Sequence, residues 1–102
     1  MMSREKTKVE IKEEFMSHMR SIAKYWAGLP DKTPHERCDG VAFSILAMID
    51  GCSFFPALDI AVHPHPDDME YHKKNGENWY EPGMVFNDDT SLHDEWHSAK
   101  KT

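Results

Sequence analysis

The stretch TPHERCDGVAFSILAMIDG, residues 33–51, contains the strongest folding signal in the chain. Thr33 can accept hydrogen bonds from the first turn of a helix, and Pro34 suits the first helical position. Glu36 lies three residues after Thr33 and can return a hydrogen bond to its backbone, which completes a capping box. We therefore predict that a helix begins at Thr33 and continues to the glycine at residue 51.

The second half of this helix is apolar on nearly every side. Residues 41–49 read VAFSILAMI, and only Ser44 interrupts the apolar run. A helix that is apolar all round is covered all round. We therefore predict that it is the central core helix or part of a subunit interface. Gly40 lowers helix propensity by about 1 kcal/mol, and we attribute it to close packing against another backbone.

A longer amphipathic helix is predicted before it, over about residues 4–27. Its apolar stripe follows steps of three and four residues and comprises Ile11, Phe15, Met19, Ile22 and Trp26. The segment GLPDKTP, residues 28–34, ends this helix, because Gly28 can take a positive φ and Pro30 prevents the helix from restarting.

The fold class that we predict is α+β: a small, mostly helical domain with three main helices, one short helix and a short β-hairpin or edge strand. The strand signal is the alternation of apolar and other residues in LDIAVH, residues 58–63. The short helix is expected over 66–74, and the last helix over about 91–100. No repeat or linker divides the chain, so residues 1–102 are predicted to form a single domain.

The charge is unevenly distributed along the 102 residues. The net charge is −6, and residues 52–102 carry ten acids and four bases, whereas residues 1–51 carry eight of each. This excess argues against direct nucleic-acid binding, because phosphates are bound by Lys and Arg. It favours a basic protein partner or a cation.

The remaining composition predicts a cytoplasmic protein that does not enter the membrane. No run of 18 apolar residues is present, and the charged N-terminal segment is not a signal peptide. Cys38 and Cys52 match no zinc or redox spacing. We expect both to be free, buried thiols in a reducing compartment.

The segment AVHPHPDDMEYH, residues 61–72, is a candidate metal site. Asp68 and His72 are four residues apart on the expected short helix and share a face, and His65 precedes that helix. Two imidazoles and a carboxylate are ordinary zinc ligands, and a fourth open position would suit catalysis. Asp67 or Glu70 would then act as base. The alternative interpretation is a proline-initiated helix with acids in its first turn and no ligand.

A second candidate is the loop NGENWYEPG, residues 75–83, whose candidate binding residues are Glu77, Asn78, Trp79, Tyr80 and Glu81. Aromatic side chains in a loop can anchor a partner or stack on a ligand. They can equally cover the protein's own core, and the sequence leaves both interpretations open.

Three blocks of the sequence resemble a family of small uncharacterised phage and prophage proteins. The blocks are HERCDGVAFSILAMIDG (35–51), PHPDDMEYHKKNGENWYEP (64–82) and SLHDEW (91–96), so the resemblance covers about residues 33–97. It implies a phage origin and a life in the bacterial host cytoplasm. It brings no established activity with it.

The function that we predict is that of a non-enzymatic phage accessory protein. Its acidic second half would bind a basic surface on a host protein, for example to inhibit a defence factor. One alternative is a metal-dependent hydrolase that uses His65, Asp68 and His72. A second alternative is a binder of a small nucleotide at an oligomer interface. The apolar helices also predict a homo-oligomer.

Overall fold

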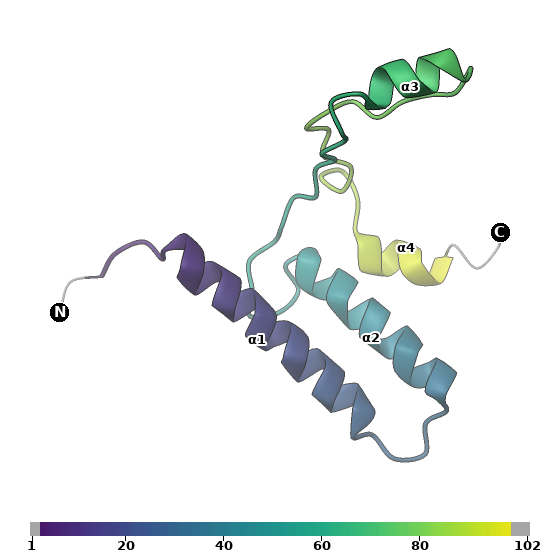
Figure 1. Ribbon diagram of the computed structural model, residues 1–102. Helices are drawn as coiled ribbons and strands as arrows, with labels where there is room; N and C mark the ends of the chain where they lie inside the picture. Colours follow the sequence, from purple (N-terminus) through teal and green to yellow (C-terminus); the bar gives the residue numbers. More distant parts are fainter. Residues whose placement is uncertain (1–2, 99–102) are drawn as a thin grey trace. The chain divides into compact units, whose positions relative to one another are not determined.

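The computed structural model describes residues 3–98 and contains four helices in that range (Figure 1). They are α1 (Lys8–Ala27), α2 (Pro34–Ile49), α3 (Asp68–Lys74) and α4 (Leu92–Ser98). The chain divides into two compact units, each of which is described by itself. The helical unit comprises Met1–Ala57 with Ser91–Thr102, and the acidic unit comprises Leu58–Thr90.

Helix α1 begins four residues later than predicted because the chain provides a capping box there. The Thr7 side chain accepts a hydrogen bond from the Glu10 backbone N–H, and the Glu10 carboxylate accepts one from the Thr7 N–H. Arg4 binds the same carboxylate, and this contact and the Thr7 N–H lower the pKa of Glu10 to about 2. At the other end, Gly28 has φ −88°, so the positive φ predicted there is wrong. In this loop the positive φ, 58°, is at Asp31.

Helix α2 begins as the sequence predicts. The Thr33 and Glu36 side chains and backbones form the reciprocal capping box, and Pro34 occupies the first turn. The prediction that α2 is covered on all sides is wrong for this chain by itself. In the described part of α2, only Gly40 and Met48 are buried, and the apolar residues between 41 and 47 remain half-buried.

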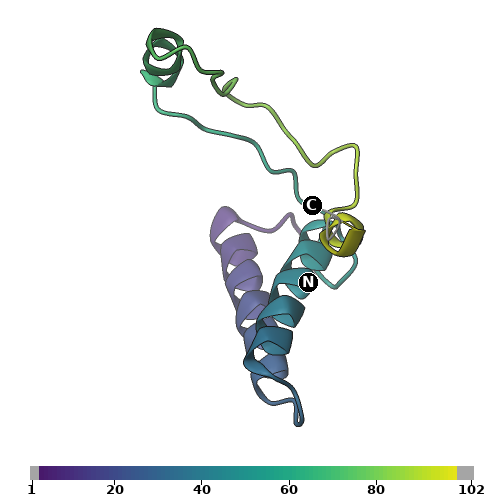
Figure 2. The same ribbon diagram turned by 90° about the vertical axis from the view of Figure 1, so that its right-hand side faces the viewer.

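Helices α1 and α2 lie side by side and run in opposite directions (Figures 1 and 2). The Trp26 ring lies against Gly40, where a Cβ atom would be 2.4 Å from the ring. The indole N–H donates a hydrogen bond of 2.8 Å to the Ser44 hydroxyl, which fixes the ring in place. Gly40 therefore accommodates an aromatic ring from α1, not a backbone as predicted.

Helix α4 packs on α2, and Asp50 holds its first turn. The Asp50 carboxylate accepts hydrogen bonds from the backbone N–H groups of Leu92 and His93, at 3.1 and 2.8 Å, and from the Ser91 hydroxyl. The His93 ring lies against the same carboxylate. Burial raises the Asp50 pKa, but these hydrogen bonds outweigh it and the net pKa is lowered. The predicted residues 99–100 of this helix lie outside the described part of the chain.

The predicted α+β class is wrong: the regular secondary structure within residues 3–98 is helical, and no strand or sheet is present among these residues. The segment 58–62 is extended and runs antiparallel to 83–87, but a single isolated bridge joins Ala61 to Val85. Backbone hydrogen bonds at Val62 and Ile60 accompany the bridge. Two short segments with one bridge do not build a ladder, which explains why alternation alone misled the prediction.

The apolar core of the described chain is small. Its buried hydrophobic residues are Ile22, Met48 and Phe55, and Phe55 packs edge-on against Phe15 at 5.8 Å between ring centroids. Many apolar side chains on both long helices therefore remain in contact with solvent. Within residues 3–98, no helix is long and apolar enough to cross a membrane.

Candidate functional site

The whole net charge of the protein resides in the acidic unit. Residues 58–90 contain eight acids and two bases, a net charge of −6, whereas the helical unit contains ten of each. The acids are Asp59, Asp67, Asp68, Glu70, Glu77, Glu81, Asp88 and Asp89. The uneven charge of the two halves of the sequence therefore corresponds to one neutral and one acidic structural unit.

Within this unit, Asp68 joins helix α3 to the loop 75–83. The Asp68 carboxylate accepts a hydrogen bond of 3.2 Å from the Tyr80 backbone N–H and lies 3.2 Å from Nε2 of His72. The other ring nitrogen of His72 lies 3.1 Å from the Glu77 carboxylate. The two segments that the sequence singled out separately therefore form one site.

Two hollows flank Asp68 in the acidic unit. One, of about 290 Å³, is lined by His65, Asp67, Asp68 and Tyr71. The other, of about 270 Å³, is lined by Val62, His63, Pro64, Asp68 and Tyr80. Each therefore combines the Asp68 carboxylate with a tyrosine ring. Both lie near the lower end of the roughly 300–1,000 Å³ that is typical of pockets for small molecules.

Of the three predicted metal ligands, Asp68 and His72 are in contact at 3.2 Å, and His65 lines one hollow together with Asp68. Nδ1 of His65 accepts a hydrogen bond of 3.1 Å from the Asp67 backbone N–H. His72 directs its two nitrogens at two different carboxylates, those of Asp68 and Glu77. In the part of the chain that the structure describes, no group of three or more His, Cys, Asp or Glu residues is placed to hold a metal ion. The predicted bases, Asp67 and Glu70, are both exposed.

The predicted binding residues Glu77, Asn78, Trp79, Tyr80 and Glu81 are all exposed. Trp79 is 41% exposed and Tyr80 is 59% exposed, so neither ring covers a core. Lys73 of α3 lies 5.1 Å from the centroid of the Trp79 ring, in the geometry of a cation–π contact. The loop thus already presents one aromatic face to a cation within the protein.

Asn87 connects the two extended segments of the acidic unit through its side chain, and sequence reasoning missed this residue. It is buried, and its side-chain amide donates to the Leu58 carbonyl at 2.8 Å and accepts from the Ile60 N–H at 2.7 Å. These contacts replace the strand pairing that the alternation in 58–63 predicted. The available signal was the sequence Phe-Asn-Asp-Asp, in which an asparagine follows an apolar run, but that pattern occurs in many turns.

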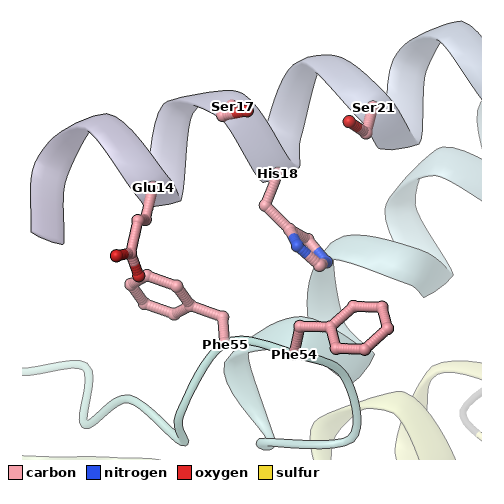
Figure 3. A pocket seen from close by; sticks show the side chains of 6 residues that line it. All are labelled: Glu14, Ser17, His18, Ser21, Phe54 and Phe55. Carbon is pink, nitrogen blue, oxygen red and sulfur yellow. The ribbon is translucent and has the colours of Figure 1, made fainter.

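A third hollow, also missed from the sequence, lies in the helical unit between α1 and the turn after α2 (Figure 3). It measures about 250 Å³ and is lined by Glu14, Ser17, His18, Ser21, Phe54 and Phe55. Phe54 is fully exposed. Figure 3 shows the His18 ring directed from α1 toward the two phenylalanines. His18 lies between the apolar positions of the α1 stripe, where the sequence indicated only a polar face.

The histidines of α4 pack on α2. The His97 ring stacks on Phe43 with the ring centroids 5.0 Å apart, and the His93 ring contacts Asp50 at the end of α2. Trp96 is 40% exposed and donates its indole N–H to Asp39. Cys38 and Cys52 are free as predicted, but both are exposed.

Comparisons with protein-family models, with curated proteins and with solved structures found no match to this chain. The resemblance of residues 33–97 to small phage and prophage proteins therefore stays a prediction.

Proposed function

We propose that the protein is a non-enzymatic binding protein whose acidic unit recognises lysine or arginine side chains on a basic protein surface. The observation that carries this proposal is the pair of hollows on the two sides of Asp68, each of which combines that carboxylate with a tyrosine ring.

The chemistry of the hollows matches a cationic side chain. A carboxylate forms a charge-assisted hydrogen bond with a guanidinium or an ammonium group. The face of a tyrosine attracts the same cation and contributes about 0.5–1 kcal/mol at an exposed site. The other acids of the unit raise the local negative potential and steer a basic partner toward it.

The resemblance to phage and prophage proteins supports a particular setting for this binding. In a bacterial host cytoplasm, the partner would be a host protein with a basic surface, for example a defence factor that itself binds nucleic acid. Occupying such a surface would inhibit that factor without any catalysis.

Binding of a fluorescent, arginine-rich peptide, measured by anisotropy at increasing salt concentrations, tests the proposal. We expect the affinity to fall steeply with salt, because the Debye length shortens from about 8 Å at physiological salt to about 3 Å at 1 M. Replacing Asp67 and Asp68 together by Asn should weaken binding about tenfold or more, because charge-assisted hydrogen bonds at the hollows are lost. Asn keeps an acceptor oxygen for the Tyr80 N–H.

The matched control is the double substitution Asp88→Asn, Asp89→Asn, which removes the same charge from two exposed positions outside both hollows. It should weaken binding only slightly. Equal losses in the two double variants would show that diffuse charge, and not the Asp68 site, is responsible. Binding that does not change with salt would overturn the proposal as a whole.

A further inference from the structure

An apolar groove lies between the two long helices of the helical unit, and it shares no lining residue with the hollow of Figure 3. It measures about 420 Å³ and is lined by Ala23, Trp26, Ala27, Arg37, Cys38, Val41, Ala42 and Ile45. Apart from Arg37, these side chains offer almost no polar group. The groove is lined by residues of α1 and α2, and the apolar residues of α2 between 41 and 47 are only half-buried. It therefore lacks the cover that the sequence of α2 predicts.

The apolar side of α1 continues beyond the groove. Met16 precedes Ala23 by seven residues, and Val9 precedes Met16 by seven, so the three lie on one side of the helix. Met16 is 44% exposed and Val9 is also exposed. The side of α1 that borders the groove thus presents two large apolar residues toward its N-terminus and two alanines toward its C-terminus.

We propose that a second copy of this chain covers the groove, so that two α1–α2 hairpins form a four-helix bundle with two-fold symmetry. A two-fold axis perpendicular to this side of α1, between residues 16 and 23, exchanges the two positions. Met16 of each copy then lies opposite Ala23 of the other and fills the groove that Ala23, Ala27 and Ile45 border. A two-fold interface must be self-complementary in this way.

Charge and size are both suited to this occupant. The helical unit has ten acids and ten bases, so two helical units carry no net charge that opposes their contact, whereas the acidic unit carries the net charge of −6. Two helices, each about 10 Å in diameter, and the 16 residues of α2, about 24 Å long, give a face on the order of 500 Å² in projection. The accessible area of a face covered with side chains exceeds its projection. It therefore approaches the roughly 800 Å² that each partner contributes to a standard interface.

Arg37, at the rim of the groove, has an unpaired group that supports the proposal of a missing partner at this surface. Its guanidinium donates to the Leu29 carbonyl at 2.8 Å, but its Nε atom is buried and has no acceptor within residues 3–98. A buried donor without an acceptor is costly in a finished structure. The rim of the groove thus contains a buried polar group without a partner in the described part of one copy.

Sedimentation of Ala23→Asp beside Ser21→Asp tests the interface. Both substitutions add one carboxylate to an exposed position of α1, but Ala23 borders the groove and Ser21 borders the hollow of Figure 3. We expect the parent protein and Ser21→Asp to sediment as dimers. Ala23→Asp should raise the dimer dissociation constant on the order of a hundredfold or more, because it buries an unpaired charge. Circular dichroism verifies that each variant is folded.

The two exposed cysteines allow a second test on the unmodified protein. Cys38 lines the groove and Cys52 does not. Alkylation of Cys38 should slow as protein concentration rises, while alkylation of Cys52 keeps its rate. A parent protein that sediments as a monomer, equal dissociation of both variants, or Cys38 alkylation that ignores concentration would each overturn the proposal. None of these results depends on whether the acidic unit binds a basic partner.

Discussion

Individual residues at the ends of helices decide much of this structure. Asp50 is the best example, because this residue ends α2 and its carboxylate holds the first turn of α4. Its side chain is only 6% exposed, and its hydrogen bonds from Leu92 and His93 lower its pKa despite burial. A carboxylate stabilised in the folded state contributes stability that is present above its unfolded pKa, about 3.9. That contribution is lost as pH falls through the lower pKa of the folded state.

Replacing Asp50 by Ala should therefore cost about 1–3 kcal/mol of unfolding free energy at neutral pH, because the donors of Leu92 and His93 lose a charged acceptor. The variant should also lose less stability than the parent protein when the pH is lowered from about 7 to about 3. Urea unfolding at each pH measures both effects. Glu13→Ala, at an exposed position of α1, serves as control. A parent protein and an Asp50→Ala variant with the same pH dependence would contradict this account of Asp50.

The residue scale also shows where sequence reasoning ends. Thr33 and Glu36 lie three residues apart, so their capping box could be predicted from the sequence. Gly40 was correctly expected to pack closely, but its neighbour is the Trp26 ring, which is fourteen residues away in the sequence. No local pattern identifies such a neighbour.

At the scale of elements, the helices were predictable and the extended segments were not. Both long helices carry local signals, namely periodic apolar residues and capping boxes. The segment 58–63 alternates as a strand would, yet a strand also requires a partner of sufficient length. Here the neighbouring segment 83–87 provides one bridge, and the Asn87 side chain supplies further contacts. The contact between Asp68 and Tyr80 was unpredictable for a similar reason. Each residue was singled out from the sequence, but their contact depends on how the loop 75–83 returns to α3.

Asn87 should be the residue on which the order of the extended segments most depends. Asn87→Ala leaves the Ile60 N–H and the Leu58 carbonyl without their partners, at a cost of about 1–3 kcal/mol for each group that stays buried. We expect faster amide hydrogen exchange at Ile60, Val62 and Phe86 in this variant. Asn78→Ala, at an exposed position of the same unit, should leave these rates unchanged. Equal exchange rates in both variants would show that Asn87 does not hold these segments.

At the scale of the whole molecule, the two units divide the physical properties of the chain between them. The helical unit is electrically neutral and leaves an apolar groove uncovered, whereas the acidic unit carries the entire net charge and two small hollows. The proposed dimer would therefore contain two acidic units. Two linked sites bind a surface with repeated basic patches far more tightly than one site does.

The measurement that tests the central claim most directly is a two-dimensional nitrogen–proton NMR titration of the labelled full chain with the arginine-rich peptide. If the hollows beside Asp68 bind cationic side chains, the backbone amide shifts should concentrate between residues 62 and 81. The amides of α1 and α2 should then stay unchanged. Shifts spread along the helical unit, or shifts in the acidic unit that are no larger near Asp68 than near Asp88 and Asp89, would contradict the claim.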